Sequence, residues 1–232
     1  MKKSFLYALK HSVPILISFI PVGLAYGVLM ENAGYNFLWT GACSLFVLAG
    51  SLQFLMVTFF AGGISLAMVA LMALLLNSRH IFYGLPFIEK FRKFGPWKYF
   101  LIYSMADESF SLHCSHDFGQ DVDEKQAYIF TAALVVVYWV GLSVLGSLLG
   151  SLITFDTAGI DFALTALFIV ILLEQMKGAD SKLPAVVAFA SSIVCLAIFG
   201  AANFILPSLV VTVLLLILLR GKIELKTGKG EA

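Results

Sequence analysis

The stretch AYIFTAALVVVYWVGLSVLGSLLGSLI, residues 127–153, contains no charged side chain. A helix needs roughly 20 mainly apolar residues to cross the hydrocarbon core of a bilayer. This stretch therefore predicts a transmembrane helix. Seven more segments of similar character follow from the same criterion, at 13–31, 37–60, 63–83, 97–113, 160–176, 183–201 and 204–220.

The composition agrees with this interpretation. Of 232 residues, 60% are hydrophobic and 12% are charged, whereas soluble domains have about 25% charged residues. The connections between the segments are short and polar, and no soluble domain or linker interrupts them. We expect an all-α, polytopic integral membrane helix bundle with about eight transmembrane segments and broken helices, formed by residues 1–232 as a single transmembrane domain.

Charge and cysteine content exclude several classes of protein. The formal net charge is +1, so no basic excess indicates a nucleic-acid partner. The cysteines, Cys43, Cys114 and Cys195, are too widely spaced to suggest a disulfide framework. His113, Cys114 and His116 lie too close together for the separated ligand pairs of a structural zinc site. No catalytic or cofactor-binding motif occurs, so we expect neither an enzyme nor a metal or cofactor.

Lysine and arginine near segment ends prefer the cytoplasmic side. Eight spans with both termini inside give ten positive side chains on the inner side and four on the outer side. The loop at 89–98 carries those four and conflicts with this arrangement. If segment 37–60 were re-entrant instead of spanning, the count would be seven against seven. The count favours eight spans and leaves an irregular second segment open.

Two segments carry residues that interrupt helices. Pro14 and Pro21 lie in the first segment, and Ala49-Gly50-Ser51 lies near the middle of the second. Broken helices often line transporter binding sites. The pairs Gly23/Gly27 and Gly146/Gly150 also have the small-xxx-small spacing of closely packed membrane helices. Either role is compatible with the sequence.

Polar and charged residues stand out at the end of the third segment and inside the fourth. Asn77, His80 and Tyr83 have helical spacing and would share one face, with Arg79 beside them. Arg79 could face a partner, or it could snorkel to the headgroups from a helix end. Asp107 and Glu108 lie about ten residues into segment 97–113, which places them near mid-bilayer.

Charge at that depth is costly and persists where it meets a partner, a cavity or a substrate. Adjacent carboxylates on a helix point about 100° apart, so we expect one to pair with Arg79 or to accept hydrogen bonds. The other could bind a substrate ammonium group or a proton. The alternative is a purely structural ion pair between the third and fourth segments. Asp161, which opens the sixth segment, is interpreted as a helix N-cap.

Four stretches in chain order, GSLQF at 50–54, NSRHIFYG at 77–84, ADESFSL at 106–112 and IDFALTALF at 160–168, resemble the AzlC family of branched-chain amino acid permeases. The resemblance implies the larger subunit of a two-component exporter of branched-chain amino acids in the bacterial cytoplasmic membrane. It also implies a small AzlD-like membrane partner and coupling to the proton gradient.

A zwitterionic substrate needs a donor for its carboxylate, an acceptor for its ammonium group and an apolar pocket. For the carboxylate we expect Arg79 and Asn77, or backbone amides near Gln53. Asp107 or Glu108 would hold the ammonium group, and His80 or an acidic residue could carry a coupled proton. Apolar contacts are expected from Phe54, Phe82 and Phe110.

Two other classes of function remain as alternatives. The chain could be a non-transporting scaffold that stabilises a smaller membrane subunit, with its polar residues buried between helices. An intramembrane hydrolase using Asp107 and Asp161 has no second motif around either aspartate to support it.

Overall fold

A computed structural model describes residues 1–60, 62–115, 118, 121–152, 169, 172, 173, 176 and 182–227. The chain divides into two compact units, Met1–Asp161 and Phe162–Ala232, called here the first and second units. All regular elements in the described residues are helices, which confirms the all-α prediction. That residues 1–232 form one transmembrane domain stays a prediction.

The first unit contains α1 (Lys2–Asn32), α2 (Phe37–Phe46), α3 (Gly50–Phe60), α4 (Leu66–Asn77), α5 (Arg79–Tyr83), η1 (Leu85–Phe87), α6 (Ile88–Arg92), α7 (Trp97–Tyr103), α8 (Asp107–Cys114) and α9 (Glu124–Leu152). The second unit contains α11 (Leu183–Asn203) and α12 (Ile205–Thr227).

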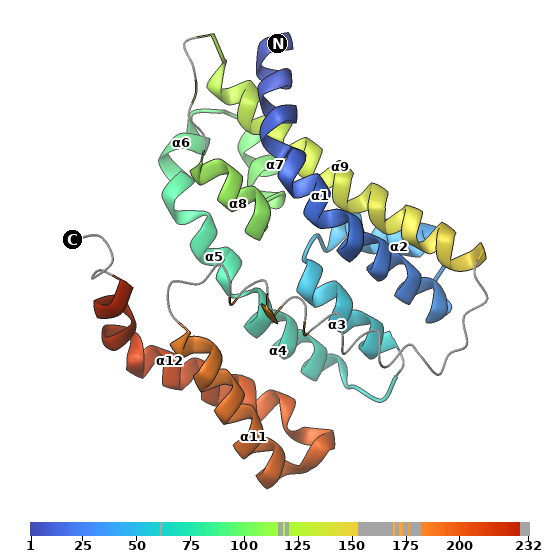
Figure 1. The fold of residues 1–232 in the computed structure, drawn as a ribbon, viewed down its shortest axis with the longest axis vertical. Coiled ribbons are helices and arrows are strands. Elements are labelled where there is room, and N and C mark those ends of the chain that lie inside the picture. Colours follow the sequence, from blue (N-terminus) through green and yellow to red (C-terminus); the bar gives the residue numbers. More distant parts are fainter. Residues whose placement is uncertain are drawn as a thin grey trace. The chain divides into compact units, whose positions relative to one another are not determined.

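Helices α1 and α9 lie side by side along much of their length (Figure 1). Their contact uses both glycine pairs. A Cβ atom built on Gly27 would lie 2.7 Å from the carbonyl carbon of Gly146, and one built on Gly146 would lie 2.7 Å from the Cα atom of Leu24. Small residues let two helix backbones approach this closely. The packing role of the glycines is therefore confirmed.

The expected interruption of the first segment is wrong. Helix α1 continues from Lys2 to Asn32 with Pro14 and Pro21 inside it. Each proline removes one backbone donor, and in membrane helices such gaps are tolerated when a neighbouring helix supports the chain. Here α9 packs along α1, while Pro14 and Pro21 themselves are exposed.

The two ends of the first unit are distinguished by contacts between distant residues. At the end that holds the N-terminus, Lys3 pairs with Asp121 at 2.8 Å, and Lys90 pairs with Glu124 at 2.7 Å. We call this the N-terminal end. At the opposite end, the hydroxyl of Ser147 donates to the carboxylate of Glu31. We call it the Glu31 end.

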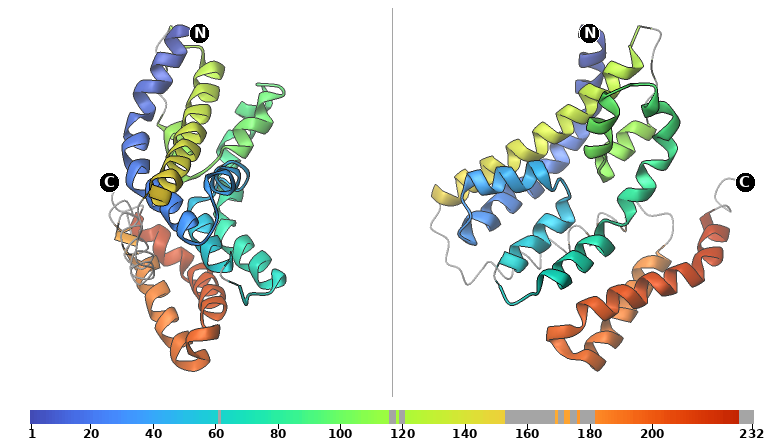
Figure 2. Two further views of the ribbon diagram at one scale, coloured as in Figure 1. Left: turned by 90° about the vertical axis from the view of Figure 1, so that its right-hand side faces the viewer. Right: turned by 180° about the vertical axis from the view of Figure 1, so that it is seen from behind.

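Helices α2 and α3 form a hairpin based at the Glu31 end. Asn36 caps α2 by accepting hydrogen bonds from Leu38 and Trp39, as an N-cap side chain does. The chain breaks at 47–49, where Leu48 takes a left-handed conformation with φ of 44°. It then turns back through α3 (Figure 2), and the ring centroids of Tyr35 and Phe60 lie 4.5 Å apart. The predicted break in the second segment is confirmed.

Helices α7 and α8 form a second hairpin, based at the N-terminal end. The chain breaks at 104–106, and the Ser109 hydroxyl connects the two sides of the break. It accepts from the Ala106 amide at 2.7 Å and donates to the Ser104 carbonyl at 2.6 Å. The end of α8 returns to α9, where the Tyr128 hydroxyl donates to the His113 carbonyl at 3.4 Å. A continuous helix over 97–113 is therefore wrong.

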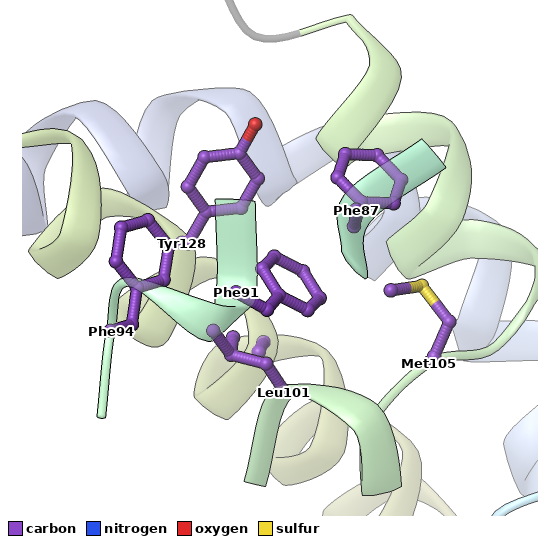
Figure 3. Packing of buried hydrophobic residues seen from close by; sticks show 7 residues of the cluster. Phe87, Phe91, Phe94, Leu101, Met105 and Tyr128 are labelled. Atoms are coloured by element: carbon purple, nitrogen blue, oxygen red, sulfur yellow. The ribbon is translucent and has the colours of Figure 1, made fainter. Parts of the chain in front are cut away.

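Aromatic side chains fill the space between the second hairpin and its neighbours. Rings from the 87–94 segment contact α7 and the first turns of α9. The largest buried residues of this hydrophobic cluster are Phe87, Phe91, Phe94, Leu101, Met105 and Tyr128 (Figure 3). The Lys90 ammonium lies 5.2 Å above the Tyr128 ring and 3.2 Å from its hydroxyl. This cluster fixes the base of the second hairpin against α9.

Among the described residues, four helical stretches are long and apolar enough to cross a membrane: Lys2–Asn32, Leu66–Arg92, Glu124–Leu152 and Leu183–Gly200. Shorter apolar helices occur at Phe37–Phe46, Gly50–Phe60 and Pro207–Leu219. A polytopic helical membrane protein is thus confirmed, whereas the number eight stays a prediction. Most of segment 160–176, including Asp161, lies outside the described residues.

Within the second unit, α11 and α12 pack against each other. The hydroxyls of Ser191 on α11 and Thr212 on α12 are hydrogen bonded, and Thr212 also donates to the Ser208 carbonyl at 2.6 Å. Gly200 interrupts the helical backbone near the end of α11 with φ of 73°, a value that glycine adopts without steric cost.

Candidate functional site

Two helix breaks of the first unit, at 47–49 and 104–106, meet near Arg79. Arg79 begins α5 directly after Ser78, whose backbone keeps helical dihedral angles. Its Nη1 atom lies 2.8 Å from Oδ2 of Asp107, which begins α8. Its Nη2 atom donates to the Ser51 hydroxyl at 3.3 Å, in the first turn of α3. The predicted pairing of Arg79 with one of the two carboxylates is confirmed, and Asp107 is that partner.

The second carboxylate oxygen of Asp107 accepts a hydrogen bond from the Tyr83 hydroxyl. The Tyr83 ring stacks on Phe110 with centroids 4.8 Å apart, and His80 meets its edge at 5.4 Å. Side-chain exposures of 34% for Arg79 and 35% for Asp107 show that the pair is shielded but reachable. Charge, hydroxyl and aromatic ring are therefore held in one place.

Glu108 differs from its neighbour. Its side chain is half-buried, and among the described residues it forms no ion pair and no hydrogen bond with another side chain. Both acidic residues lie in the first turn of α8, where the helix dipole favours negative charge. Within the described part of the chain, Asp107 is thus paired with Arg79, whereas Glu108 takes part in no ion pair.

The expectation that Arg79 lies near a helix end and could snorkel is wrong. The helical stretch continues to Arg92, so Arg79 lies at the middle of Leu66–Arg92, about 20 Å from each end at the helical rise per residue. The sequence did not indicate that the helix continues to Arg92, because the charged residues Glu89 and Lys90 resemble the start of a loop.

The polar stripe along α4 and α5 is only partly assembled around the ion pair. The His80 Nδ1 atom lies 3.1 Å from the backbone carbonyl of Asn77, and the His80 ring meets Tyr83 as expected from their spacing. Phe82, in contrast, is 65% exposed. Phe110 lies within the group through its contact with Tyr83.

Gln53 lies in a separate buried network. Its Nε2 donates to the Ser44 hydroxyl at 3.1 Å, and its Oε1 accepts from Nε1 of Trp139 at 2.8 Å. The side chain is completely buried, and so is Phe54, whose ring meets Tyr26 at 5.5 Å. Both ends of the amide join α2, α3 and α9 to one another. A substrate contact by Gln53 stays a prediction.

Sequence reasoning missed three partners in these networks: Ser51, Ser44 and Trp139. Serine hydroxyls readily bond to nearby backbone carbonyls in helices, so a serine in an apolar segment carries little signal. Trp139 offered a weak signal, since a buried indole N–H generally finds an acceptor. Nothing in the sequence indicated that this acceptor would be Gln53.

The family model described as AzlC protein matches residues 14–153. The "Branched-chain amino acid transport protein AzlC" of Bacillus subtilis is 33% identical over 221 residues, which cover 95% of this chain and 87% of that protein. An "Uncharacterized membrane protein" of Helicobacter pylori is 35% identical over 96% of this chain and 97% of its own.

The "Inner membrane protein YgaZ" of Escherichia coli is 36% identical over 81 residues, which are 35% of this chain and 33% of that protein. No solved structure matches the chain. The matched family model spans α1 to α9, including both hairpins and the residues around Arg79. On the family match and on its similarity to the Bacillus subtilis protein over nearly its whole length, the chain belongs to the AzlC family.

Proposed function

We propose that the protein is a secondary transporter that exports branched-chain amino acids such as valine, leucine and isoleucine. The observation that carries this proposal is the Arg79–Asp107 ion pair with Glu108 beside it, held where the breaks of two hairpins meet the Leu66–Arg92 stretch. The name of the Bacillus subtilis relative supports the choice of substrate.

A zwitterion can replace the internal ion pair without leaving either charge alone. The substrate carboxylate would take Arg79, whose planar guanidinium suits bidentate contact with a carboxylate. The ammonium group would take Asp107 and Glu108. This exchange avoids the large cost of an unpaired charge inside the membrane. Phe110 and the ring of Tyr83 would supply apolar contact for the branched side chain.

Coupling to the proton gradient is the second part of the proposal. Glu108 is a candidate proton carrier because it forms no ion pair with a described residue. His80 is the other candidate, since imidazole titrates in the physiological range. It lies against Tyr83, which donates to Asp107. A proton bound at either residue would change the charge of the site as substrate binds or leaves.

The bacterial cytoplasmic membrane is the proposed location, and a small AzlD-like membrane protein is the proposed partner. The printed name of the Escherichia coli relative supports the inner membrane. Large apolar side chains that face outward from the helices, such as Trp39, Phe46 and Leu74, fit contact with lipid or with another membrane subunit.

Export of radiolabelled valine from cells loaded with a valine-containing dipeptide tests the proposal. We expect Arg79→Ala and Asp107→Asn to lower the initial export rate at least tenfold, because each leaves a charge without its partner. Glu108→Gln should abolish the dependence of export on the proton gradient. Glu89→Gln is the matched control, since Glu89 is exposed and lies outside the site.

Full export by all three variants at equal membrane abundance would overturn the site. Unchanged valine efflux after deletion of the chain and its partner would overturn the transport function itself.

The scaffold function is the alternative, and the closed Gln53 network is the observation that favours it. Liposomes containing the purified chain alone, the partner alone and both together separate the two functions. A scaffold would show no flux of its own beyond that of the partner. Replacing residues of the Arg79 site would then leave the flux of the complex unchanged.

A further inference from the structure

We infer that the first unit crosses the membrane three times, with α1, Leu66–Arg92 and α9. Its two hairpins are re-entrant: each enters the bilayer from one face and returns to that face. The α2–α3 hairpin would enter from the Glu31 end and the α7–α8 hairpin from the N-terminal end. The N-terminal end would face the cytoplasm and contact the anionic surface of its leaflet.

The contacts at the base of each hairpin carry the first step. Tyr35 precedes α2 and Phe60 ends α3, and their ring centroids lie 4.5 Å apart with the rings tilted by 39°. Lys90 precedes α7, Glu124 follows α8, and their charged groups lie 2.7 Å apart. Each hairpin therefore begins and ends at the same end of the first unit. A segment that crossed the membrane once would begin and end at opposite ends.

The lengths of the arms agree. Helices α2 and α3 have 10 and 11 residues, and α7 and α8 have 7 and 8. At about 1.5 Å per residue, each arm covers about half or less of a hydrocarbon core of about 30 Å. Hairpins with such arms reach the middle of the bilayer and turn back.

The tips of the two hairpins meet. The Tyr103 hydroxyl, at the end of α7, donates to the Leu45 carbonyl, near the end of α2. Arg79, at the middle of the Leu66–Arg92 stretch, contacts Ser51 of one hairpin and Asp107 of the other. Interrupted backbone at this depth is tolerated where protein or a cavity surrounds it.

Charge then assigns the faces. The segments around the N-terminal end carry eight basic residues: Lys2, Lys3, Lys10, Lys90, Arg92, Lys93, Lys98 and Lys125. The connections 33–36 and 61–65 at the Glu31 end carry no lysine or arginine. Positive charge of this distribution belongs on the cytoplasmic side, where anionic headgroups attract it. The loop at 89–98 no longer conflicts with the rest.

Aromatic side chains mark both boundaries. Trp97 and Tyr99 are 47% and 68% exposed at the N-terminal end, and Phe37 and Trp39 are 40% and 61% exposed at the Glu31 end. Exposed aromatic residues gather at the two membrane interfaces. Their positions agree with interfaces at the bases of the hairpins.

Cysteine labelling tests the arrangement. In a background with Cys43→Ala, Cys114→Ser and Cys195→Ala, single cysteines are introduced by Ala33→Cys, Ile64→Cys, Lys93→Cys and Ser115→Cys. A membrane-impermeant maleimide is applied to intact cells and to inverted vesicles. We expect Ala33→Cys and Ile64→Cys to label only in cells, and Lys93→Cys and Ser115→Cys only in inverted vesicles.

Eight full crossings would instead place Ile64→Cys inside and Lys93→Cys outside. Opposite sidedness within the pair Ala33→Cys and Ile64→Cys, or within the pair Lys93→Cys and Ser115→Cys, would overturn the corresponding hairpin. Labelling of Lys93→Cys and Ser115→Cys in intact cells would overturn the cytoplasmic assignment. Lys3→Cys reports the N-terminus, and retention in the membrane confirms that each variant is inserted. The readout does not require transport, so it is independent of the proposed function.

Discussion

At the scale of single residues, the site depends on charges that neutralise one another where water is scarce. The charged groups of Arg79 and Asp107 lie 2.8 Å apart. Arg79 also donates a hydrogen bond to Ser51, and Asp107 accepts one from Tyr83. Further hydrogen bonds help a shielded ion pair to hold its geometry, so removal of either hydroxyl is informative. The buried Nε atom of Arg79 has no hydrogen-bond partner within the described residues.

Tyr83→Phe removes the hydroxyl that donates to Asp107 and keeps the ring that stacks on Phe110. A hydrogen bond to a charged group contributes about 1.5–3 kcal/mol, and partial exposure of the acceptor lowers this to about 1–2 kcal/mol. We expect a loss of that size in the free energy of unfolding, measured by SDS titration in mixed micelles.

The control for this variant is Tyr99→Phe. Tyr99 is 68% exposed, and its hydroxyl forms no hydrogen bond within the described residues. An equal loss of stability in both variants would contradict a specific role of the Tyr83 hydroxyl.

Gln53→Leu leaves the indole N–H of Trp139 and the hydroxyl of Ser44 without their partner in a fully buried place. Each unsatisfied buried group costs about 1–3 kcal/mol, so we expect the two groups together to cost about 2–6 kcal/mol by the same titration. In a double-mutant cycle with Trp139→Phe, the two losses should be less than additive. Strict additivity would contradict a direct interaction.

At the scale of helices, the first unit is organised by α1 against α9 and by the two broken hairpins beside them. The close approach of α1 and α9 depends on Gly27 and Gly146, because the atoms that an added Cβ would meet belong to backbone, which cannot rotate away. The hairpin breaks depend on local hydrogen bonds, of which those of Ser109 are the clearest.

Gly27→Ala and Gly146→Ala should each destabilise the protein by about 1–3 kcal/mol, the usual cost of overpacking. The matched control is Gly141→Ala, which lies on α9 with no atom within 4 Å of its built Cβ. Alanine favours a helix over glycine by up to about 1 kcal/mol, so Gly141→Ala should be neutral or stabilising. A similar loss at all three positions would contradict the packing explanation.

At the scale of the whole molecule, the outward-facing apolar side chains of α1, α2 and α4 require a lipid or protein environment. Exposed apolar surface of this extent is incompatible with a monomer dispersed in water. The proposed environment is the cytoplasmic membrane of a bacterium, with the basic N-terminal end of the first unit on its inner side.

Fractionation of bacterial membranes on a sucrose gradient checks this proposal. We expect the chain to sediment with an inner-membrane marker and to stay with the membrane after an alkaline carbonate wash, because apolar helices hold it in the bilayer. Peripheral proteins bound by charge are released by such a wash. Release from the membrane, or sedimentation with an outer-membrane marker, would contradict the proposed location.

The sequence predicted the helical membrane class, the break near Gly50 and the packing of the glycine pairs, because each depends on residue type and short-range spacing. It also predicted that Arg79 pairs with Asp107 or Glu108, since an isolated charge in an apolar segment needs a partner, but it did not decide which of the two. It was wrong about Pro14 and Pro21 in α1, because residue type alone does not decide whether a helix ends at a proline or continues through it.

The sequence by itself thus determined which parts of the chain avoid water and which side chains have to be neutralised there. Only the tertiary structure decided that Asp107 and Glu108 begin a helix after a break, that Trp139 closes the Gln53 network, and that the chain returns to the same end before α7 and after α8. Hydropathy is a local property, so it does not show whether an apolar segment crosses the membrane or turns back within it. The direction of each hairpin follows from contacts such as Lys90 with Glu124, which join residues far apart in the sequence.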